Sequence, residues 1–350
     1  IAEKYDLHAN ALMQTKVTCT EWDVDSGRWL VKTDRGDAIK ARFVVHSNGP
    51  LNRPKLPAIS GITSFKGHTF HTSRWDYGYT GGNSDGGLNK LKNKRVAVIG
   101  TGATAVQCVP HLGASAAELY VFQRTPSSID LRNNQPTDPD WLASQKPGWH
   151  EARRRNFESL MAGVPVKQDL VNDGWTEAFR LLFGTVRDKA PSKLRMACWA
   201  LLAVGSRDFY RKGAKKYLTE KAMRHMQFDR EMELADFRKM ESIRARVDRL
   251  VDDTDTAEAL KPYYRQFCKR PCFHDEYLQT FNRPNVTLVD TGGRGVNEIN
   301  TKGIVLDGKT YEVDCIIFAT GFEVGTDYSR RAGYQIYGIG GQSISQKWAD

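Results

Sequence analysis

The clearest chemical pattern in the chain is formed by Gly100, Gly102 and Ala105, which make a G-x-G-x-x-A sequence. It directly follows the apolar, β-branched run 95–99, which is typical of a buried parallel strand, and an apolar helical pattern begins behind it. This order of strand, motif and helix indicates a dinucleotide-binding turn, because the glycines let the backbone turn tightly and approach a pyrophosphate. The start of the helix would offer free N–H groups to the phosphates.

A basic residue follows the next predicted strand. The run 118–122 is followed by Gln123, Arg124 and Thr125. NAD-binding domains usually have an acidic residue here, which hydrogen-bonds the ribose 2′-hydroxyl, whereas a guanidinium suits a 2′-phosphate. The sequence therefore predicts a site for NADP(H) rather than NAD(H).

Two β-meanders are predicted on either side of this motif. The first has strands at 16–22, 28–33 and 39–46, and the second has strands at 286–289, 303–306 and 310–313, followed by a strand at 315–318. The ends of the two regions, 44–50 and 316–322, are similar in pattern. We therefore expect an α/β fold with two dinucleotide-binding (Rossmann-like) domains. Only the second has its fingerprint loop, so we expect a fragment whose first domain is incomplete.

Residues 139–262 are predicted to form a helical insertion. Apolar residues recur at spacings of three and four in 149–161, 176–186, 193–209 and 232–251. Its tryptophans suit a lid or a substrate wall, and ordinary core packing is an equal alternative. The predicted division is 1–51 and 326–350 for an FAD-binding domain, 52–138 and 263–325 for the NADP-binding domain, and 139–262 for the insertion.

Composition excludes several classes of protein. The 350 residues are 40% hydrophobic and 26% charged, and no apolar run reaches the length of a membrane span. The net charge of +10 comes from scattered residues, so we expect neither nucleic acid nor membrane as a partner. Cys268 and Cys272 enclose two cations and a proline, which argues against a redox pair or a metal site. A cytoplasmic location fits this cysteine usage, no metal is predicted, and the oligomeric state is open.

A second motif lies at residues 65–76. Phe65, Gly67, His71, Trp75 and Asp76 match the pattern F-x-G-x-x-x-H-x-x-x-W-(P or D). This pattern resembles the fingerprint of Baeyer–Villiger monooxygenases, a branch of the flavin monooxygenases. Gly-Thr-Gly-Ala-Thr-Ala at 100–105, Lys-Arg-Pro at 269–271, Phe-Asn-Arg-Pro-Asn-Val at 281–286 and Ala-Thr-Gly-Phe at 319–322 also look like that family, so the resemblance covers essentially the whole chain.

The resemblance implies an enzyme that uses FAD and NADPH. Such enzymes insert one oxygen atom of O2 next to a ketone carbonyl through a C4a-peroxyflavin, giving an ester or a lactone. Several segments look closest to members that act on bulky or macrocyclic ketones. Arg270 matches the catalytic arginine of the family, which stabilises developing negative charge. His71 and Trp75 are expected to have a structural or gating role.

The family also implies a set of cofactor-binding residues. Arg124 and Thr125, with Lys269, would hold the 2′-phosphate, and Val17 is weakly similar to a flavin-contacting position. The residues expected around the pyrophosphate are Gly100, Thr101, Gly102, Ala103, Thr104, Ala105, Val106 and Gln107.

The sequence departs from the family in one respect, and it leaves alternatives open. The family's FAD loop, and the aspartate that partners its arginine, would lie before residue 1. We therefore expect this chain alone to bind NADP+ without turnover. A flavin monooxygenase that oxidises nitrogen or sulfur, a disulfide reductase and a non-enzymatic NADP-binding module are the alternatives.

Overall fold

The computed structural model describes residues 2–162, 164, 166–177, 179–180 and 215–349. The chain divides into two compact units, one formed by residues 1–57 with 320–350 and the other by residues 58–319. None of the helices in the described ranges combines the length and apolar character that a membrane span requires. The predicted helix at 193–209 lies outside the described residues, as does most of the one at 176–186.

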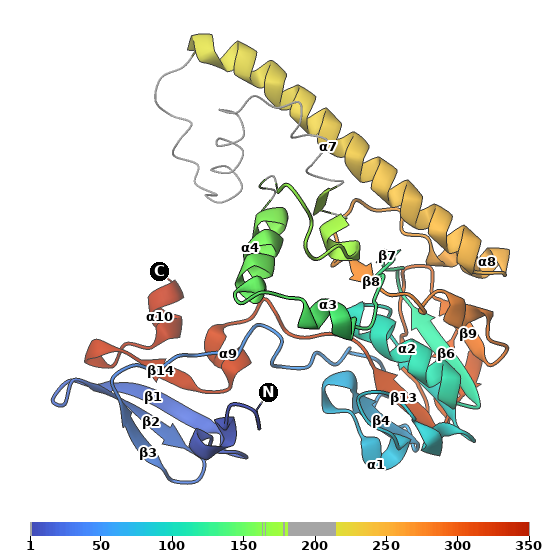
Figure 1. The fold of residues 1–350 in the computed structure, drawn as a ribbon. Helices are drawn as coiled ribbons and strands as arrows, with labels where there is room; N and C mark the ends of the chain where they lie inside the picture. Colours follow the sequence, from blue (N-terminus) through green and yellow to red (C-terminus); the bar gives the residue numbers. More distant parts are fainter. Residues whose placement is uncertain (1, 163, 165, 178, 181–214, 350) are drawn as a thin grey trace. The chain divides into compact units, whose positions relative to one another are not determined.

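The second unit is built on a five-stranded parallel sheet (Figure 1). Its strand order is β4-β13-β5-β6-β9, so the chain crosses over between neighbours, as parallel pairing requires. The strands are β4 (His68–His71), β5 (Arg95–Ile99), β6 (Glu118–Gln123), β9 (Val286–Asp290) and β13 (Cys315–Phe318). The parallel sheet and the α/β class predicted from the sequence are confirmed.

The two faces of this sheet bury different partners. Val96 and Val98 of β5 pack with α2 (Ala103–Ser115) in one apolar cluster. Ala97 and Ile99, which point to the other face, pack with Ile304 of an antiparallel meander. The meander consists of β10 (Glu298–Ile299), β11 (Gly303–Leu306) and β12 (Lys309–Glu312). The sheet is therefore covered on both faces, which explains its nearly continuous apolar strands.

The prediction for 286–289 was wrong in one respect. These residues form β9, but β9 pairs in parallel with β6 at the edge of the main sheet and is not part of the meander. The meander takes Glu298–Ile299 as its first strand instead. Local alternation indicates a strand but does not say which neighbour the strand pairs with.

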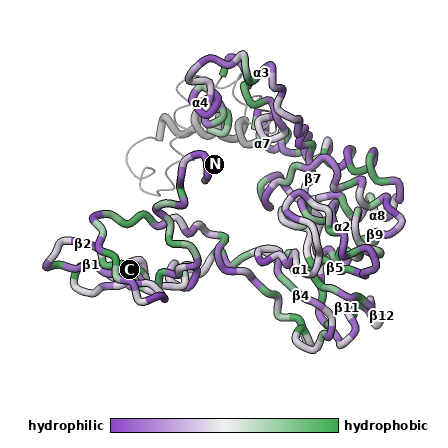
Figure 2. Tube along the Cα trace, turned by 60° about the horizontal axis from the view of Figure 1, so that its bottom comes forward, coloured by the Kyte–Doolittle hydropathy of each residue, from purple (hydrophilic) through white to green (hydrophobic). Residues whose placement is uncertain are grey.

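Helices and short turns complete this unit. The short elements are η2 (Thr72–Arg74), α1 (Tyr77–Thr80), η3 (Asn89–Leu91) and η5 (Gln279–Asn282). The insertion contributes α3 (Pro139–Ala143), α4 (Trp149–Met161), α7 (Lys215–Leu250) and α8 (Thr254–Leu260), of which α4 is largely hydrophilic (Figure 2). Two short strands, β7 (Ile129–Asp130) and β8 (Cys272–Phe273), pair in parallel. In sequence, β7 precedes the insertion and β8 follows it.

The first unit is a four-stranded sheet in the order β14-β1-β2-β3. Its elements are η1 (Leu7–Asn10), β1 (Val17–Asp23), β2 (Arg28–Thr33), β3 (Ala38–Ala41), α9 (Tyr328–Ala332), β14 (Gln335–Tyr337), η6 (Ile339–Gly341) and α10 (Ile344–Ala349). Val17, the weak flavin candidate, is half-buried in β1.

The predicted strand at 39–46 is only partly correct. The paired strand ends at Ala41, and residues 42–46 do not form a strand. Phe43 is 82% exposed and Val45 is 85% exposed. The apolar, β-branched composition correctly suggested strand propensity, but pairing also requires a neighbouring strand, which the described residues do not provide here.

Candidate dinucleotide-binding site

The turn between β5 and α2 is built around Gly100. Its φ of 112° lies in the left-handed region, and a Cβ here would come within 2.6 Å of the Ala319 carbonyl oxygen at the end of β13. Glycine is therefore required both by the backbone conformation and by the neighbouring strand. The turn directs the chain from the carboxyl end of the central strand into the first turn of α2, where ligands bind in parallel α/β folds.

Gly102 is the N-cap of α2, and its surroundings are open. A Cβ added there would meet no atom within 4 Å, and the cap makes no side-chain hydrogen bond. The first amide groups of the helix therefore have the partial positive charge of a helix start without a capping oxygen. A pyrophosphate could approach this backbone closely, which fits the dinucleotide reading of the motif.

The other predicted residues of the turn have more varied surroundings. The Thr101 hydroxyl donates to the Thr125 carbonyl oxygen at 3.0 Å. Ala105 and Val106 point into the core, and the Val106 amide donates to the Gly102 carbonyl oxygen at 3.0 Å. The exposed Gln107 side chain donates to Ala103 O at 2.9 Å. Direct phosphate contacts would therefore come mainly from the backbone of Gly102, Ala103 and Thr104, with Ala103 and Thr104 half-buried.

Three of the predicted phosphate-binding residues lie together at the end of β6. The Lys269 ammonium donates to the Thr125 hydroxyl and, at 3.2 Å, to the Pro126 carbonyl oxygen. Burial, and secondarily the charge of Arg124, lower the pKa of Lys269 below its usual range. Two cations are thus held close enough to repel each other. Among the residues that the structure describes, neither forms an ion pair, so a bound anion would relieve the repulsion.

Tyr264 and Ser127 hold this group in place, and no local pattern in the sequence indicated either residue. The Tyr264 hydroxyl donates to Pro126 O at 3.2 Å and accepts from the Ser128 amide at 2.9 Å. Its ring lies 4.9 Å from the Lys269 Nζ. The Ser127 hydroxyl donates to Thr101 O at 2.7 Å, which joins the glycine turn to the end of β6.

Arg270 is exposed and follows Lys269 directly. Within the described part of the chain, its guanidinium makes no hydrogen bond or ion pair. The carbonyl oxygen of Arg270 accepts a weak hydrogen bond from the Cys272 thiol at 3.6 Å, and burial raises the pKa of that thiol to about 11. Cys268 and Cys272 are both free thiols, and no group of metal-binding side chains occurs in the described ranges.

The fingerprint 65–76 has a structural explanation within this unit. A Cβ on Gly67 would lie 2.4 Å from the Phe65 ring and 2.7 Å from Asp314 O, so only glycine fits. His71 is buried and accepts from the Ser73 amide at 3.1 Å. The Trp75 indole donates to the Thr80 hydroxyl at 3.1 Å. Both side chains therefore have hydrogen-bond partners next to β4, at the edge of the sheet, and the structural or gating role expected for them stays a prediction.

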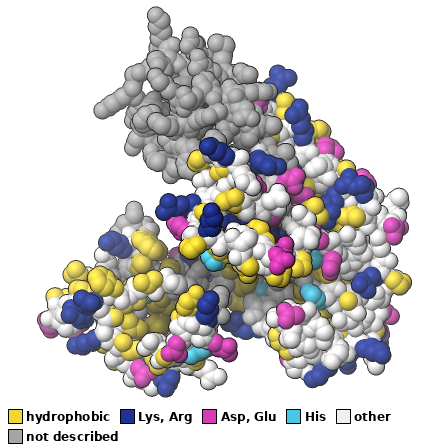
Figure 3. Space-filling model, viewed as in Figure 1, with side chains coloured by type: hydrophobic (Ala, Val, Ile, Leu, Met, Phe, Trp, Pro, Cys, Tyr) yellow, Lys and Arg dark blue, Asp and Glu magenta, His cyan; other side chains and the backbone are white. Residues whose placement is uncertain are grey.

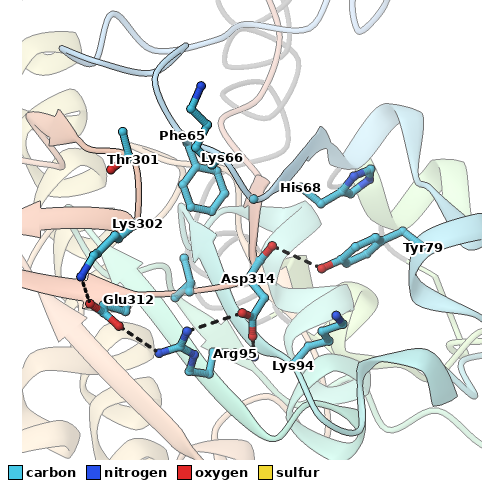
Figure 4. A pocket seen from close by; sticks show the side chains of 12 residues that line it. Phe65, Lys66, His68, Tyr79, Lys94, Arg95, Thr301, Lys302, Glu312 and Asp314 are labelled. Atoms are coloured by element: carbon cyan, nitrogen blue, oxygen red, sulfur yellow. Dashed lines mark hydrogen bonds and ion pairs between the residues drawn. The ribbon is translucent and has the colours of Figure 1, made fainter.

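A pocket of about 610 Å³ lies at the opposite ends of the strands from the glycine turn (Figure 4). Its lining comes from residues that precede or begin β4, β5 and β13, from α1 and from the meander. Arg95 pairs there with Glu312 and Asp314, each at 3.5 Å, and Lys302 pairs with Glu312 at 3.1 Å. Lys66 and Lys94 also line the pocket, but Glu312 and Asp314 would place negative charge beside a bound anion. This pocket is therefore a poorer anion site than the region around Arg124 and Lys269. Elsewhere on the face shown in Figure 3, Lys and Arg are spread among acidic side chains.

Comparison with known proteins identifies the family. No protein-family model matches the chain. Neopentalenolactone D synthase of Streptomyces avermitilis is 53% identical over 352 residues, covering 100% of this chain and 54% of the relative. Baeyer-Villiger monooxygenase ATR8 of Stachybotrys chlorohalonatus is 50% identical, covering 100% of this chain and 51% of the relative. The chain thus spans about half the length of the curated relatives it matches.

Solved structures agree. The polycyclic ketone monooxygenase from the thermophilic fungus Thermothelomyces thermophila has a TM-score of 0.78 and 38% identity, over 99% of this chain and 54% of that one. An oxidised steroid monooxygenase bound to NADP has a TM-score of 0.68 and 28% identity, over 99% of this chain and 60% of that one. On the strength of these likenesses, which extend over its whole length, the chain belongs to the Baeyer–Villiger monooxygenase family.

Proposed function

We propose that this chain supplies the NADP(H)-binding part of an FAD- and NADPH-dependent monooxygenase that inserts one oxygen atom of O2 next to a ketone carbonyl. The observation that carries the proposal is the pair of Arg124 and Lys269 beside an open glycine turn. A dianionic 2′-phosphate complements two cations that have no carboxylate partner in the described structure. The uncapped start of α2 complements the pyrophosphate.

The roles of the remaining residues follow from their positions. FAD, reduced by NADPH, would supply the oxygen-activating chemistry of the family, and Val17 is the residue here proposed to contact it. Arg270, adjacent to Lys269, is proposed to stabilise negative charge that develops on the reacting oxygen atoms, because in the described structure its guanidinium has no carboxylate partner to neutralise it. The names of two similar solved structures, a polycyclic ketone and a steroid monooxygenase, support a bulky ketone as substrate.

Equilibrium binding tests the nucleotide assignment directly. Isothermal titration calorimetry on the 350-residue chain should give a lower Kd for NADP+ than for NAD+. Arg124→Ala should weaken NADP+ binding roughly 10- to 100-fold, the loss expected for one charge-assisted hydrogen bond, and leave NAD+ binding nearly unchanged. Equal affinities for both nucleotides in the unaltered chain would contradict the proposal.

Product analysis tests the reaction. For the full-length protein with FAD, a bulky cyclic ketone should give a lactone, and Arg270→Ala should abolish lactone formation while NADP+ still binds. If a thioether is converted to its sulfoxide and no ketone gives an ester or lactone, the enzyme is a flavin monooxygenase of the other type.

A further inference from the structure

Helix α7 contacts the chain on both sides of the segment that carries Lys269 and Arg270. The Asp236 carboxylate accepts from the Gln266 amide at 2.7 Å, and Glu233 forms an ion pair with Arg265. At the other end, the Arg244 guanidinium donates to Pro262 O at 2.8 Å and Arg246 donates to His274 O at 3.2 Å. Glu233, Asp236 and Arg244 lie on one side of the helix, because spacings of three and eight residues fit its period, whereas Arg246 lies on another side. Figure 1 shows the C-terminal half of α7 passing beside β7 and β8.

A buried ion pair adds a further anchor. The Lys239 ammonium pairs with the Asp130 carboxylate, and the two side chains are 5% and 14% exposed. Asp130 ends β7, where its carbonyl oxygen accepts from the His274 amide at 2.9 Å. In the parallel pair of strands, Asp130 lies opposite Phe273. Lys239 therefore fixes the short sheet that begins two residues after Arg270.

Between these anchors the chain takes a strained path. Phe267 has a φ of 66° and is 46% exposed, although a bulky residue rarely adopts the left-handed conformation. No described side chain of α7 is hydrogen-bonded to residues 267–271. Such a conformation persists only where the surrounding structure imposes it, and strain of this kind gathers at functional sites. The contacts of α7 hold the chain on both sides of this path, and within it the Phe267 ring lies 5.5 Å from the ring of Phe179.

A role in stability alone does not explain the Lys239–Asp130 pair. Removing two charges from water costs about as much as their attraction returns, so buried pairs are often replaceable by neutral side chains without loss of stability. Such a pair specifies the relative position of the two segments it joins, because each buried charge is stable only beside a partner of opposite sign. The pair is therefore better explained as a device that fixes where β7 and β8 lie.

We propose that α7 positions the Lys269–Arg270 loop for the nucleotide, with Lys239 and Asp236 as positioning residues that do not touch it. This inference rests on the proposed function, because Lys269 is taken to hold the 2′-phosphate. Loosening either anchor would let the Lys269 ammonium move away from Thr125 and Arg124. The affinity for NADP+ would then fall, whereas the affinity for NAD+, which lacks the 2′-phosphate, would not.

The test measures nucleotide discrimination by calorimetry on the full chain. The double variant Lys239→Met with Asp130→Asn removes the pair without stranding a buried charge. It should keep its unfolding temperature within a few degrees, weaken NADP+ binding about tenfold and change NAD+ binding less than twofold. Lys239→Arg, which keeps a cation opposite Asp130, should retain most of the preference for NADP+ over NAD+ that the double variant loses. Lys302→Met with Glu312→Gln, which removes an exposed pair in the same unit, is the matched control and should change neither affinity.

Asp236→Ala provides an independent arm if the double variant does not fold. It removes the acceptor for the Gln266 amide and should reduce the preference for NADP+ severalfold, whereas Asp236→Asn, which keeps an acceptor oxygen, should not. A folded double variant, or a folded Asp236→Ala variant, that retains the full preference for NADP+ would overturn the inference. Absence of that preference in the unaltered chain would instead reject the proposed nucleotide site, and the inference with it.

Discussion

Gly100 and Gly102 are two residues apart, and they are glycine for different reasons. Gly100 needs its left-handed φ and the space beside Ala319, whereas Gly102 has an ordinary φ of −75° and open space around it. Gly100→Ala should therefore destabilise the chain by at least about 2 kcal/mol, because strain and a backbone clash add. Gly102→Ala should cost no more than about 1 kcal/mol. Denaturant unfolding of both variants measures the difference.

Gly102→Ala should have a large effect on nucleotide affinity, although its effect on stability is small. If a pyrophosphate lies against Gly102, a methyl group there should weaken NADP+ and NAD+ binding alike by about tenfold or more, since both nucleotides carry it. A Gly102→Ala chain that is stable and binds both nucleotides normally would show that no phosphate approaches this backbone.

The lowered pKa of Lys269 predicts a pH dependence of NADP+ binding. A bound phosphate favours the charged lysine, so binding raises its pKa, and affinity is greatest at pH values below the pKa of the free protein. Affinity should fall as pH rises through that pKa, which lies below the usual lysine value of about 10.4. Titrations from about pH 7 to about pH 10 measure this fall. Lys269→Arg should abolish it, because a guanidinium stays charged; an unchanged slope would assign the titration to another group.

The sequence indicated some of these residues and not others, for physical reasons. Arg124 follows a strand in a known pattern, so its position is set locally. Tyr264 and Lys239 act through partners more than a hundred residues away, and no local spacing encodes such contacts. One signal was present for Lys239: it lies four and eight residues before the buried Ile243 and Val247, on the apolar stripe of α7.

Among the elements, the apolar runs that contain Phe43 and Phe318 differ in what surrounds them, because Phe318 ends β13 whereas Phe43 lies beyond the end of β3 at Ala41. They occupy similar sequence patterns, yet Phe43 is 82% exposed and Phe318 is 4% exposed between β4 and β5. In this chain Phe318→Ala should cost about 3–5 kcal/mol of unfolding free energy, and Phe43→Ala should change it by less than about 0.5 kcal/mol. Thermal or denaturant unfolding checks both, and a large effect at Phe43 would mean that it is buried in solution.

The same comparison explains which elements could be predicted. The bounds of β5 and β13 follow from apolar runs, and burial on both faces of the sheet reinforces that signal. Those of α4 follow from a helical period. The pairing of β9 and the missing partner beyond Ala41 depend on other strands in space. Composition reports the tendency to form a strand, and topology decides whether that tendency is used.

At the scale of the whole molecule, the proposed nucleotide site belongs to one unit. The glycine turn, Arg124, Lys269, Arg270 and α7 all lie within residues 58–319, which have their own parallel sheet and two apolar clusters. Only Val17 among the predicted cofactor residues lies in the other unit. A unit with its own core should keep its binding site when expressed alone.

Residues 58–319 expressed by themselves should therefore bind NADP+ within about threefold of the affinity of the full chain, a difference below ~1 kcal/mol. Arg124→Ala in this shorter chain should cause the same loss as in the longer one, which controls for non-specific binding. A drop of more than about tenfold, in a shorter chain whose circular dichroism and unfolding remain cooperative, would mean that residues 1–57 or 320–350 take part in holding the nucleotide. Calorimetry on both chains decides between a site contained in one unit and a site completed by the other.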